Sequence, residues 1–376
     1  MSSVLRPDLP HVIVVGGGTA GLASAWQLAE RGASVTVLDP RVAPHEDGSH
    51  GGFTRVTRHA YHEGTSYVPL VREADALWCS LESDPGELLV RTGMIEFGPP
   101  DEPEFVGVLQ ACEAFDIEHR LLDAAELRRT YPFVVPDRWQ GCWTPSAGYL
   151  RVPACLGAMR MRAQALGVDV RTGVGVVAVE TGRVVLDDSA LEADAIVVAA
   201  GVRSLELLPT PDVSVSVLRR VLFWLRPKVE PAGLPVWGAL TPSGFFYGFP
   251  PGHEGLSGLK VACHTSDAIP GLDEPVDPEA LDRSVRTEDW APVADFLRAF
   301  MPSVGLDRIE HRVCMYGATA SRDFLIDRHP SMPGVVVASG LSGHGFKFAP
   351  ALGRLVADLV LTDAEPQPEF AWAQHR

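Results

Sequence analysis

The 376-residue sequence contains no apolar run long enough to span a membrane, no internal repeat and no low-complexity segment. Its first ten residues, MSSVLRPDLP, include no apolar segment of the kind found in secretory signals. Six cysteines occur without CxxC or CxxH spacing, at positions 79, 112, 142, 155, 263 and 314. This spacing argues against a disulfide framework and against a metal site. We therefore expect a cytoplasmic protein that binds neither membrane nor metal.

Basic residues are also few relative to acidic ones. The chain has 32 Lys and Arg against 48 Asp and Glu, a formal net charge of −16. An acidic surface gains nothing from nucleic acid or from an anionic membrane, so neither is an expected partner. Hydrophobic residues make up 46% of the sequence, which is ordinary for a globular protein, and the length favours two domains.

A glycine-rich segment near the N-terminus predicts the turn of a nucleotide-binding βαβ unit. The apolar run at 11–15 is typical of a buried parallel strand, and Gly16, Gly18 and Gly21 follow it. The first glycine permits a tight turn, the second lets the backbone approach a pyrophosphate, and the third lets a helix pack closely on the strand.

The residues after these glycines complete the unit. The apolar pattern predicts a helix that ends at Gly32, whose N-terminal amides would attract phosphate without a lysine. A second strand, predicted at 34–38, leads to Asp39, which is placed to bond ribose hydroxyls. The motif predicts a dinucleotide site but does not distinguish NAD from FAD.

Further nucleotide-fold segments are dispersed along the chain. Apolar strands that run into glycine are predicted at 191–201 and 334–340, and a helix is predicted from about 350 to 361. Between them, aromatic or alternating segments such as SVSVLRRVLFWL and GFFYGFP predict a mixed or antiparallel sheet. An NAD dehydrogenase more often keeps its nucleotide domain contiguous, so this interleaving favours a flavin fold.

We therefore predict an α/β protein in which a Rossmann-like FAD-binding domain is interleaved with a mixed-sheet α+β substrate domain. The predicted FAD-binding domain is discontinuous and comprises 10–85, 146–212 and 311–365. The predicted substrate domain comprises 86–145 and 213–310.

Five further segments, in the same order along the chain, resemble the monomeric sarcosine oxidase and N-methyltryptophan oxidase family. They are GSHGGFTRVTRHAYHEG at 48–64, YVPL at 67–70, CMY at 314–316, FLIDRHP at 324–330 and SGHGFKF at 342–348. The resemblance implies a monomeric flavoprotein whose FAD is attached to a cysteine. It also implies oxidation of a small secondary amino acid to its imine, with O2 as the electron acceptor and H2O2 as the product.

The resemblance implies roles for individual residues of the cofactor site. Cys314 would be the covalent flavin link, and a thiolate there would be favoured by nearby cations. Ser49, Gly343 and Gly345 would contact the cofactor. Lys347, just before the last helix, would stabilise negative charge on the reduced flavin, as a helix N-terminus also would.

The resemblance likewise implies the residues of the substrate site. Arg58 and Lys347 would bind the substrate carboxylate, because a guanidinium forks onto a carboxylate and an ammonium adds a point charge. Lys260 would activate oxygen, and alternation on a strand places Ala262 and His264 on its face. The remaining matches are His264 near the substrate amine, Arg55 beside the flavin, and Tyr247 and Tyr316 as cavity walls.

The chain departs from the family pattern at two places. Where the family typically reads SHHGDTR, this sequence reads SHGGFTR, so Gly51 and Phe53 replace a histidine and an aspartate. This puts the electrostatics around the flavin and the covalent attachment in question. After CMY, Gly317 and Ala318 stand where the family tends to have threonine, which predicts room for a bulkier substrate.

Three other functions compete with this interpretation. One is a biosynthetic flavin-dependent imino-acid oxidase acting on a pipecolate or piperideine carboxylate. A second is an NAD(P)-dependent dehydrogenase, which the interleaved domains and the setting of Cys314 disfavour. A third is a flavin-binding protein without oxidase activity.

Overall fold

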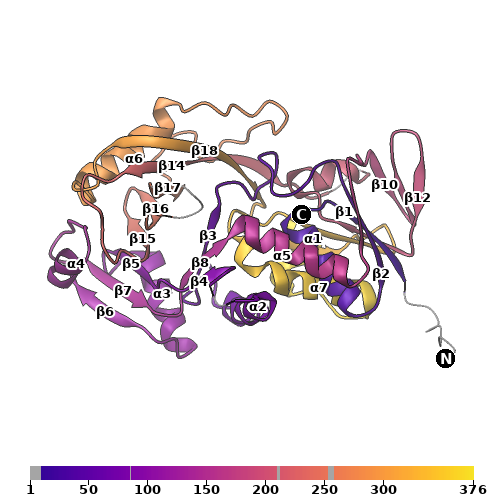
Figure 1. Cartoon of the computed structure of the whole chain (residues 1–376), viewed down its shortest axis with the longest axis horizontal. Coiled ribbons are helices and arrows are strands. Elements are labelled where there is room, and N and C mark those ends of the chain that lie inside the picture. Colours follow the sequence, from indigo (N-terminus) through magenta and orange to yellow (C-terminus); the bar gives the residue numbers. More distant parts are fainter. Residues whose placement is uncertain (1–9, 85, 210–211, 253–257) are drawn as a thin grey trace. The chain divides into compact units, whose positions relative to one another are not determined.

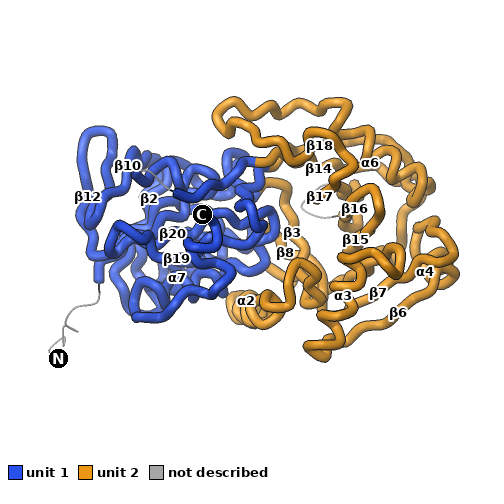
Figure 2. Tube along the Cα trace, turned by 180° about the vertical axis from the view of Figure 1, so that it is seen from behind, with its two compact units in different colours: residues 1–50, 153–217, 315–376 blue, residues 51–152, 218–314 orange. Residues whose placement is uncertain are grey.

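The computed structural model describes residues 10–84, 86–209, 212–252 and 258–376, and it divides into two compact units (Figure 2). Unit 1 comprises 1–50, 153–217 and 315–376, and unit 2 comprises 51–152 and 218–314. The chain therefore passes between the units four times. The structure places residues 51–85 in unit 2, whereas the sequence predicted them in the FAD-binding domain; which unit serves cofactor or substrate stays a prediction.

The helical elements are α1 (Thr19–Glu30), α2 (Tyr67–Leu81), α3 (Pro103–Ala114), α4 (Ala124–Thr130), α5 (Val152–Ala165), α6 (Thr287–Phe300) and α7 (Ala349–Leu361), with short 3-10 helices η1 (Gly201–Leu207), η2 (Gly345–Phe348), η3 (Pro368–Phe370) and η4 (Trp372–His375). The strands are β1 (His11–Val15), β2 (Ser34–Asp39), β3 (Thr54–Thr57), β4 (Leu89–Val90), β5 (Met94–Gly98), β6 (Arg120–Asp123), β7 (Gln140–Thr144), β8 (Gly148–Arg151), β9 (Asp169–Thr172), β10 (Ala178–Glu180), β11 (Arg183–Val185), β12 (Ala190–Glu192), β13 (Ala195–Val198), β14 (Ser216–Arg226), β15 (Val236–Thr241), β16 (Gly244–Phe249), β17 (Leu259–Thr265), β18 (Asp307–Ala318), β19 (Leu325–Arg328) and β20 (Val335–Ser339).

Unit 1 is built on a six-stranded sheet with the order β19-β20-β13-β1-β2-β9. Its pairs are parallel except that of β19 with β20. The strands predicted at 11–15, 34–38, 191–201 and 334–340 all lie in this sheet as β1, β2, β13 and β20. The predicted Rossmann-like sheet is confirmed, including the joining of segments more than 300 residues apart in sequence.

Both faces of this sheet are covered, as a parallel sheet requires. Ile13 and Val15 of β1 pack with Val179 and Val184 of the three-stranded sheet β10-β11-β12. The opposite face carries α1 and α7, which pack against each other (Figure 1). Gly353 permits this contact, since a Cβ there would lie 2.4 Å from the carbonyl oxygen of Ala23.

Unit 2 is built on an eight-stranded sheet with the order β18-β14-β17-β16-β15-β5-β7-β6. The pair β5-β15 is parallel, whereas β14-β17, β16-β17, β15-β16, β5-β7 and β6-β7 are antiparallel. This is the mixed sheet that the aromatic segments predicted. A smaller sheet, β3-β8-β4, belongs to the same unit.

Alternation gives the large sheet of unit 2 two different faces. Phe223, Val261 and Phe246 point to one face and form an apolar core with α6. Trp224 and Ala262 point to the other face, where they form a cluster with Cys314. We call this second side the Cys314 face.

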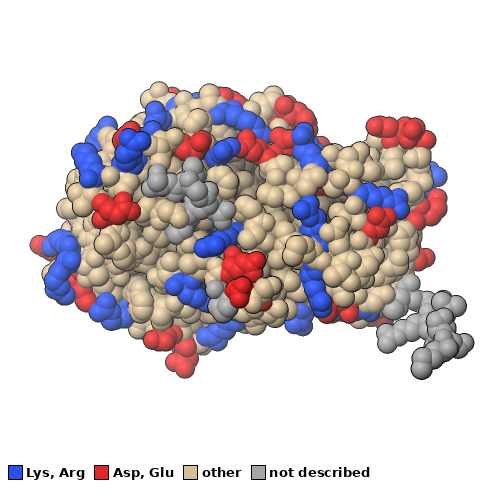
Figure 3. All heavy atoms as spheres, in the orientation of Figure 1, with Lys and Arg blue, Asp and Glu red and all other residues tan. Residues whose placement is uncertain are grey.

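No helix within the described residues is long and apolar enough to cross a membrane. The face of the molecule seen in Figure 3 carries basic and acidic side chains interspersed rather than separated into single-sign regions.

Candidate functional site

The glycine loop of unit 1 has the geometry that the sequence predicted. Gly16 has a φ of +103°, and a Cβ there would lie 2.4 Å from the carbonyl oxygen of Ala199. A Cβ on Gly21 would lie 1.8 Å from the oxygen of Gly16, so α1 packs directly against the turn. Gly18 has more room, because its nearest neighbour would be the His50 ring at 3.6 Å. Only glycine fits the first and third positions, and the second leaves the backbone approachable.

The start of α1 fits a bound anion. The helix has no side-chain N-cap and no acidic residue in its first turn, so its amides and dipole face no competing carboxylate from the helix itself. Asp39 is buried and accepts hydrogen bonds from the amides of Gly17 at 2.5 Å and Arg41 at 2.7 Å. These features fit the pyrophosphate and ribose of FAD, while a bond from Asp39 to ribose stays a prediction.

The turn before α7 is held in shape by two glycines. Gly343 has a φ of +81°, and a Cβ there would lie 2.3 Å from the ring of Tyr316. A Cβ on Gly345 would lie 2.5 Å from the side chain of Leu341. The structure thus brings predicted residues Tyr316, Gly343 and Gly345 together.

Lys347 is buried in the 3-10 helix η2, which leads directly into α7. Its Nζ donates to the carbonyl oxygen of His344 at 2.9 Å. The sequence predicted a lysine and a helix N-terminus in one place, and both are present. Ser49, by contrast, is exposed in the segment after β2. The roles of both residues stay predictions.

In unit 2, the Cys314 face collects most of the predicted catalytic residues. Lys260 and Ala262 point to this face, while Val261 and Cys263 point to the core beneath α6. The ring of His264 lies 6.3 Å from that of Tyr247, on the same side. The predicted alternation along this strand is therefore confirmed.

A left-handed bend contacts both Lys260 and Cys314 on this face. Gly52 and Phe53 have φ values of +89° and +62°, and strain of this kind in a bulky residue is uncommon. The bend turns the carbonyl of Gly51 toward the Cys314 Sγ at 3.5 Å. It also turns the carbonyl of Gly52 toward the Lys260 Nζ at 2.9 Å.

Lys260 is buried with its hydrogen bonds satisfied. Besides Gly52, its Nζ contacts the carbonyl and hydroxyl oxygens of Thr54 at 3.0 and 3.1 Å. The rings of Phe249 and Trp224 lie 4.5 and 5.5 Å from it. Burial holds the pKa of Lys260 well below its ordinary value, the charge of Arg55 lowers this pKa further, and Cys314 opposes the shift.

Two guanidinium groups, those of Arg55 and Arg312, contact residues of the bend. The Nη1 of Arg55 donates to the carbonyl of Thr54 at 2.9 Å. The guanidinium of Arg312 lies 5.7 Å from the centre of the Phe53 ring. Because Val313 points to the core beneath α6, alternation along β18 places Arg312, and not His311, on the Cys314 face. Phe53 therefore occupies the bend and packs against Arg312 and Trp224.

Arg58 lies in a buried network of charges. Its Nη2 forks onto both carboxylate oxygens of Glu63 at 2.7 Å, and its Nη1 donates to Glu96 at 3.1 Å. Burial alone would lower the pKa of Arg58, but the charges of Glu63 and Glu96 raise it above the ordinary value. The guanidinium predicted to bind a substrate carboxylate is already paired with two carboxylates of its own unit.

Three residues of this neighbourhood were missed by sequence reasoning. Glu63 and Glu96 pair with Arg58, and the Nδ1 of His62 lies 2.8 Å from its Nη1. Glu96 is an acid within the apolar strand MIEFG, and a buried acid of this kind predicts a basic partner. His62 also stacks edge-on with Phe245, whose ring lies 5.6 Å from that of His264.

The expectation of extra room beside Gly317 is not supported. A Cβ on this residue would lie 3.3 Å from side-chain carbons of both Val202 and Val215. Ala318 is buried and bridges to Leu341. Valine side chains therefore fill the space that the missing threonine side chain would occupy.

The predicted site residues are distributed over both units. Unit 1 contains the glycine loop, Asp39, Ser49, Tyr316 and the 343–347 turn. Unit 2 contains the second set, namely Arg55, Arg58, Tyr247, Lys260, His264 and Cys314. Within the described ranges, no group of three or more His, Cys, Asp or Glu side chains is arranged to hold a metal ion.

Comparison with known proteins identifies the family. Residues 11–359 match the family described as FAD dependent oxidoreductase. The monomeric sarcosine oxidase of Bacillus sp. (strain B-0618) is 32% identical over 93% of this chain and 92% of its own. The N-methyl-L-tryptophan oxidase of Yersinia pestis (strain Pestoides F) is 33% identical over 95% and 96%.

A solved structure gives the same result. NikD, described as an unusual amino acid oxidase essential for nikkomycin biosynthesis, matches with a TM-score of 0.82 at 26% identity, over 96% of this chain and 97% of its own. The α/β fold, the interleaved chain and the glycine loop agree with these matches. The chain belongs to the FAD dependent oxidoreductase family and resembles its sarcosine oxidase-like members.

Proposed function

We propose that the protein is an FAD-dependent oxidase of secondary amino acids, either N-methylated or cyclic. It would oxidise the C–N bond to an imine and reduce O2 to H2O2. The observation that carries this proposal is the Gly51–Thr54 bend, which holds a buried lysine and a buried cysteine on one face. The names of the relatives, a sarcosine oxidase and an N-methyl-L-tryptophan oxidase, favour the same substrate class.

Cys314 is the proposed point of flavin attachment. A thioether would form between its Sγ and the 8-methyl carbon of the flavin ring, and O2 would take up the two hydrogens lost, as H2O2. The contact of the Cys314 Sγ with the Gly51 carbonyl oxygen at 3.5 Å supports this role, because it holds the sulfur in one position beside the bend. Bound FAD would supply the two-electron redox chemistry.

The substrate carboxylate is proposed to bind Arg58 and Lys347. Of the two internal partners of Arg58, the Glu63 side chain is 21% exposed and the Glu96 side chain 1%. A substrate carboxylate would therefore replace Glu63 rather than Glu96. Glu96 would keep the guanidinium charged and in place while its other nitrogen binds the substrate.

The remaining residues are proposed to position the amine and to assist oxygen. Tyr247 and Tyr316 would wall the cavity, and His264 would hold the amine in its unprotonated form or orient it. Lys260 would stabilise the negative charge that develops on reduced oxygen, with Arg55 adding to the positive potential. Both side chains donate to the carbonyl oxygen of Thr54, which fixes their mutual position.

Acid precipitation of the purified holoenzyme tests the attachment. A yellow pellet is expected from the wild type and from Cys263→Ala, and a colourless pellet with yellow supernatant from Cys314→Ala. Cys263 is a matched control because it is also buried but points to the core beneath α6. Flavin that precipitates with the Cys314→Ala protein would contradict the link, and a colourless wild-type solution would contradict flavin binding.

Peroxide release tests the reaction. N-methyl and cyclic amino acids should each be assayed for H2O2, with primary amino acids as controls. A biosynthetic imino-acid oxidase is the second candidate, favoured by the likeness to NikD, and strong preference for cyclic substrates would support it. Flavin without turnover of any amine would instead support a flavin-binding protein without oxidase activity. We also propose that the protein is cytoplasmic and monomeric. Size-exclusion chromatography with light scattering tests the monomeric state.

A further inference from the structure

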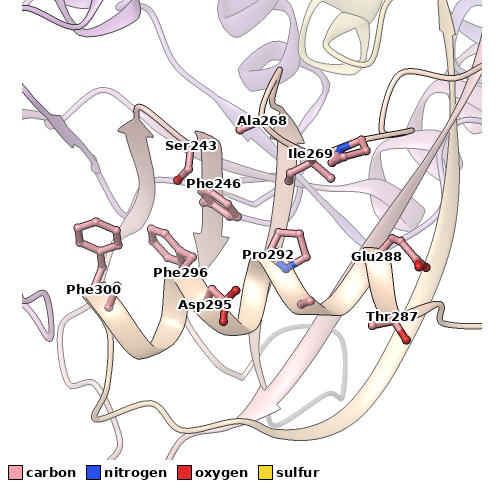
Figure 4. Close-up of a pocket in the computed structure, with 13 residues that line it drawn as sticks. Ser243, Phe246, Ala268, Ile269, Thr287, Glu288, Pro292, Asp295, Phe296 and Phe300 are labelled. Carbon is pink, nitrogen blue, oxygen red and sulfur yellow. The ribbon is translucent and has the colours of Figure 1, made fainter.

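A cavity lies on the side of the large sheet opposite the Cys314 face. It has a volume of about 540 Å³ and lies entirely within unit 2, between α6, the start of β16 and the segment after β17 (Figure 4). We call it the α6 groove. No residue of the predicted cofactor or substrate site lines it.

The floor of the groove is aromatic. Phe246 and Phe296 stack with ring centroids 4.5 Å apart and an interplanar angle of 11°, and Phe300 lies 5.4 Å from Phe296. Alternation separates this floor from the predicted active face, because Phe246 points to α6 while Tyr247 points the other way. Ile269, in the segment after β17, lines the groove on the side across from α6 (Figure 4).

The polar groups around this floor are mostly hydrogen-bond acceptors. Glu288 and Asp295 contribute carboxylates from α6, on a helical stripe that also contains Pro292. Proline has no amide hydrogen, so the Glu288 carbonyl four residues earlier lacks its usual helical donor. Thr287 and Ser243 add hydroxyl groups, and neither lysine nor arginine is among the described lining residues.

The nearby cations do not turn the groove into an anion site. Arg298 pairs with Asp295 at 2.6 Å, but these side chains are 61% and 74% exposed, so this ion pair holds the carboxylate weakly. Arg219 is buried against Asp289 and the carbonyl oxygens of the 282–284 segment. At the N-terminus of α6, the side chain of Asp289 accepts from the Arg286 amide at 2.7 Å, which places a carboxylate where an anion would bind.

The two edges of the groove are joined by hydrogen bonds. The Ser266 hydroxyl donates to the carbonyl of Ser243 at 2.6 Å and accepts from the amide of Ala268 at 3.1 Å. These contacts hold the segment after β17 against the turn before β16. The groove is therefore a built feature with an aromatic floor and a rim of acceptors.

We propose that the α6 groove binds a small hydrophobic ammonium ion. The apolar floor would contact its hydrophobic groups, while Glu288 and Asp295 would neutralise its charge at the rim. This second site would be separate from the oxidation site and independent of the proposed function. A neutral ligand of the same shape would lose the carboxylate interactions and keep only the apolar contacts.

Calorimetric titration of the FAD-loaded protein with benzyltrimethylammonium tests the proposal. This probe keeps its charge at every pH and has no N–H bond to oxidise. Its affinity should exceed that of neutral benzyl alcohol, and the double variant Glu288→Gln/Asp295→Asn should weaken it by about tenfold, since each exposed charge interaction contributes modestly. The control Glu279→Gln removes an exposed acid outside the groove and should leave the affinity unchanged.

Ala299→Trp provides an independent test of location. Ala299 is exposed and lines the groove, so an indole there would fill the cavity with little cost to folding. Loss of cation binding with an unchanged flavin spectrum supports the proposal. Equal affinity for the cation and the alcohol, or undiminished binding by the double variant or by Ala299→Trp, would overturn it.

Discussion

The Nζ of Lys260 donates a hydrogen bond of 2.9 Å to the carbonyl oxygen of Gly52, which lies 208 positions earlier in the chain. The same bend accepts a contact from Cys314 at Gly51. The bend thereby fixes the Lys260 nitrogen and the Cys314 sulfur relative to each other.

Replacing Lys260 should slow the reaction with oxygen rather than the reaction with substrate. Removal of one preorganised charge typically costs about 10²–10³ in rate, so Lys260→Met should slow flavin reoxidation by about that factor. Stopped-flow mixing of the reduced enzyme with O2 measures this directly. Equal slowing of flavin reduction and reoxidation would contradict the assigned role.

The same lysine predicts a pH dependence of reoxidation. Its burial lowers the pKa, so the cation is present below that lowered pKa and is lost as the pH rises through it. Reoxidation should therefore slow as the pH rises, at a pH below the ordinary lysine value. Lys260→Arg keeps its charge throughout and should abolish this decline; a decline that persists in that variant would exclude Lys260 as the titrating group.

Phe53 should carry a measurable backbone strain. A Cβ in the left-handed region costs about 1 kcal/mol, so Phe53→Gly should be more stable than Phe53→Ala by about that amount. Urea denaturation measures the free energy of unfolding of each variant, and the comparison isolates the Cβ because both variants lack the ring. At Leu121, an exposed position on β6 without positive φ, glycine should instead be the less stable of the pair. The same order at both positions would contradict strain at Phe53.

The sequence predicted the βαβ unit because its signals are local. Gly16, Gly21 and Asp39 lie within one short segment, and each has a requirement that turn geometry sets. Period-two alternation likewise placed Lys260 and His264 on one face. The conformation of Phe53 was not predictable, because nothing in GGF distinguishes an ordinary strand start from a left-handed bend.

The partners of Arg58 were not predictable for a different reason. Glu96 lies on β5, 38 residues after Arg58. This strand belongs to a mixed sheet, and the sequence does not specify the order of the strands in it. An arginine in a family motif was therefore assigned to a substrate without its internal partners. In the structure the Arg58 guanidinium is paired with Glu63 and Glu96, so a substrate carboxylate would have to compete with these side chains.

Glu63→Gln should strengthen binding of a carboxylate substrate. Removing the charge of Glu63 weakens the competition for Arg58, and the KM should fall by about fivefold. Steady-state assays of an N-methyl amino acid against its carboxamide measure this. The KM of the amide should not fall. A rise in KM for the amino acid, or an equal fall for the amide, would contradict displacement of Glu63.

Gly343→Ala should cost more stability than Gly201→Ala. Both glycines have positive φ, but a Cβ at position 201 meets nothing within 4 Å, whereas at 343 it meets the Tyr316 ring at 2.3 Å. The clash should add about 1–3 kcal/mol to the loss, as overpacking typically does. Thermal unfolding of both variants gives the comparison. Equal losses would contradict a steric role for the Tyr316 contact.

The flavin of this protein is proposed to accept electrons from the C–N unit of a secondary amino acid. Anaerobic mixing of the holoenzyme with a panel of N-methyl and cyclic amino acids tests it most directly. At least one member should bleach the visible absorbance of the oxidised flavin, and air should restore the colour with one H2O2 formed per flavin. A flavin that every member of the panel leaves oxidised would contradict electron transfer from a secondary amino acid.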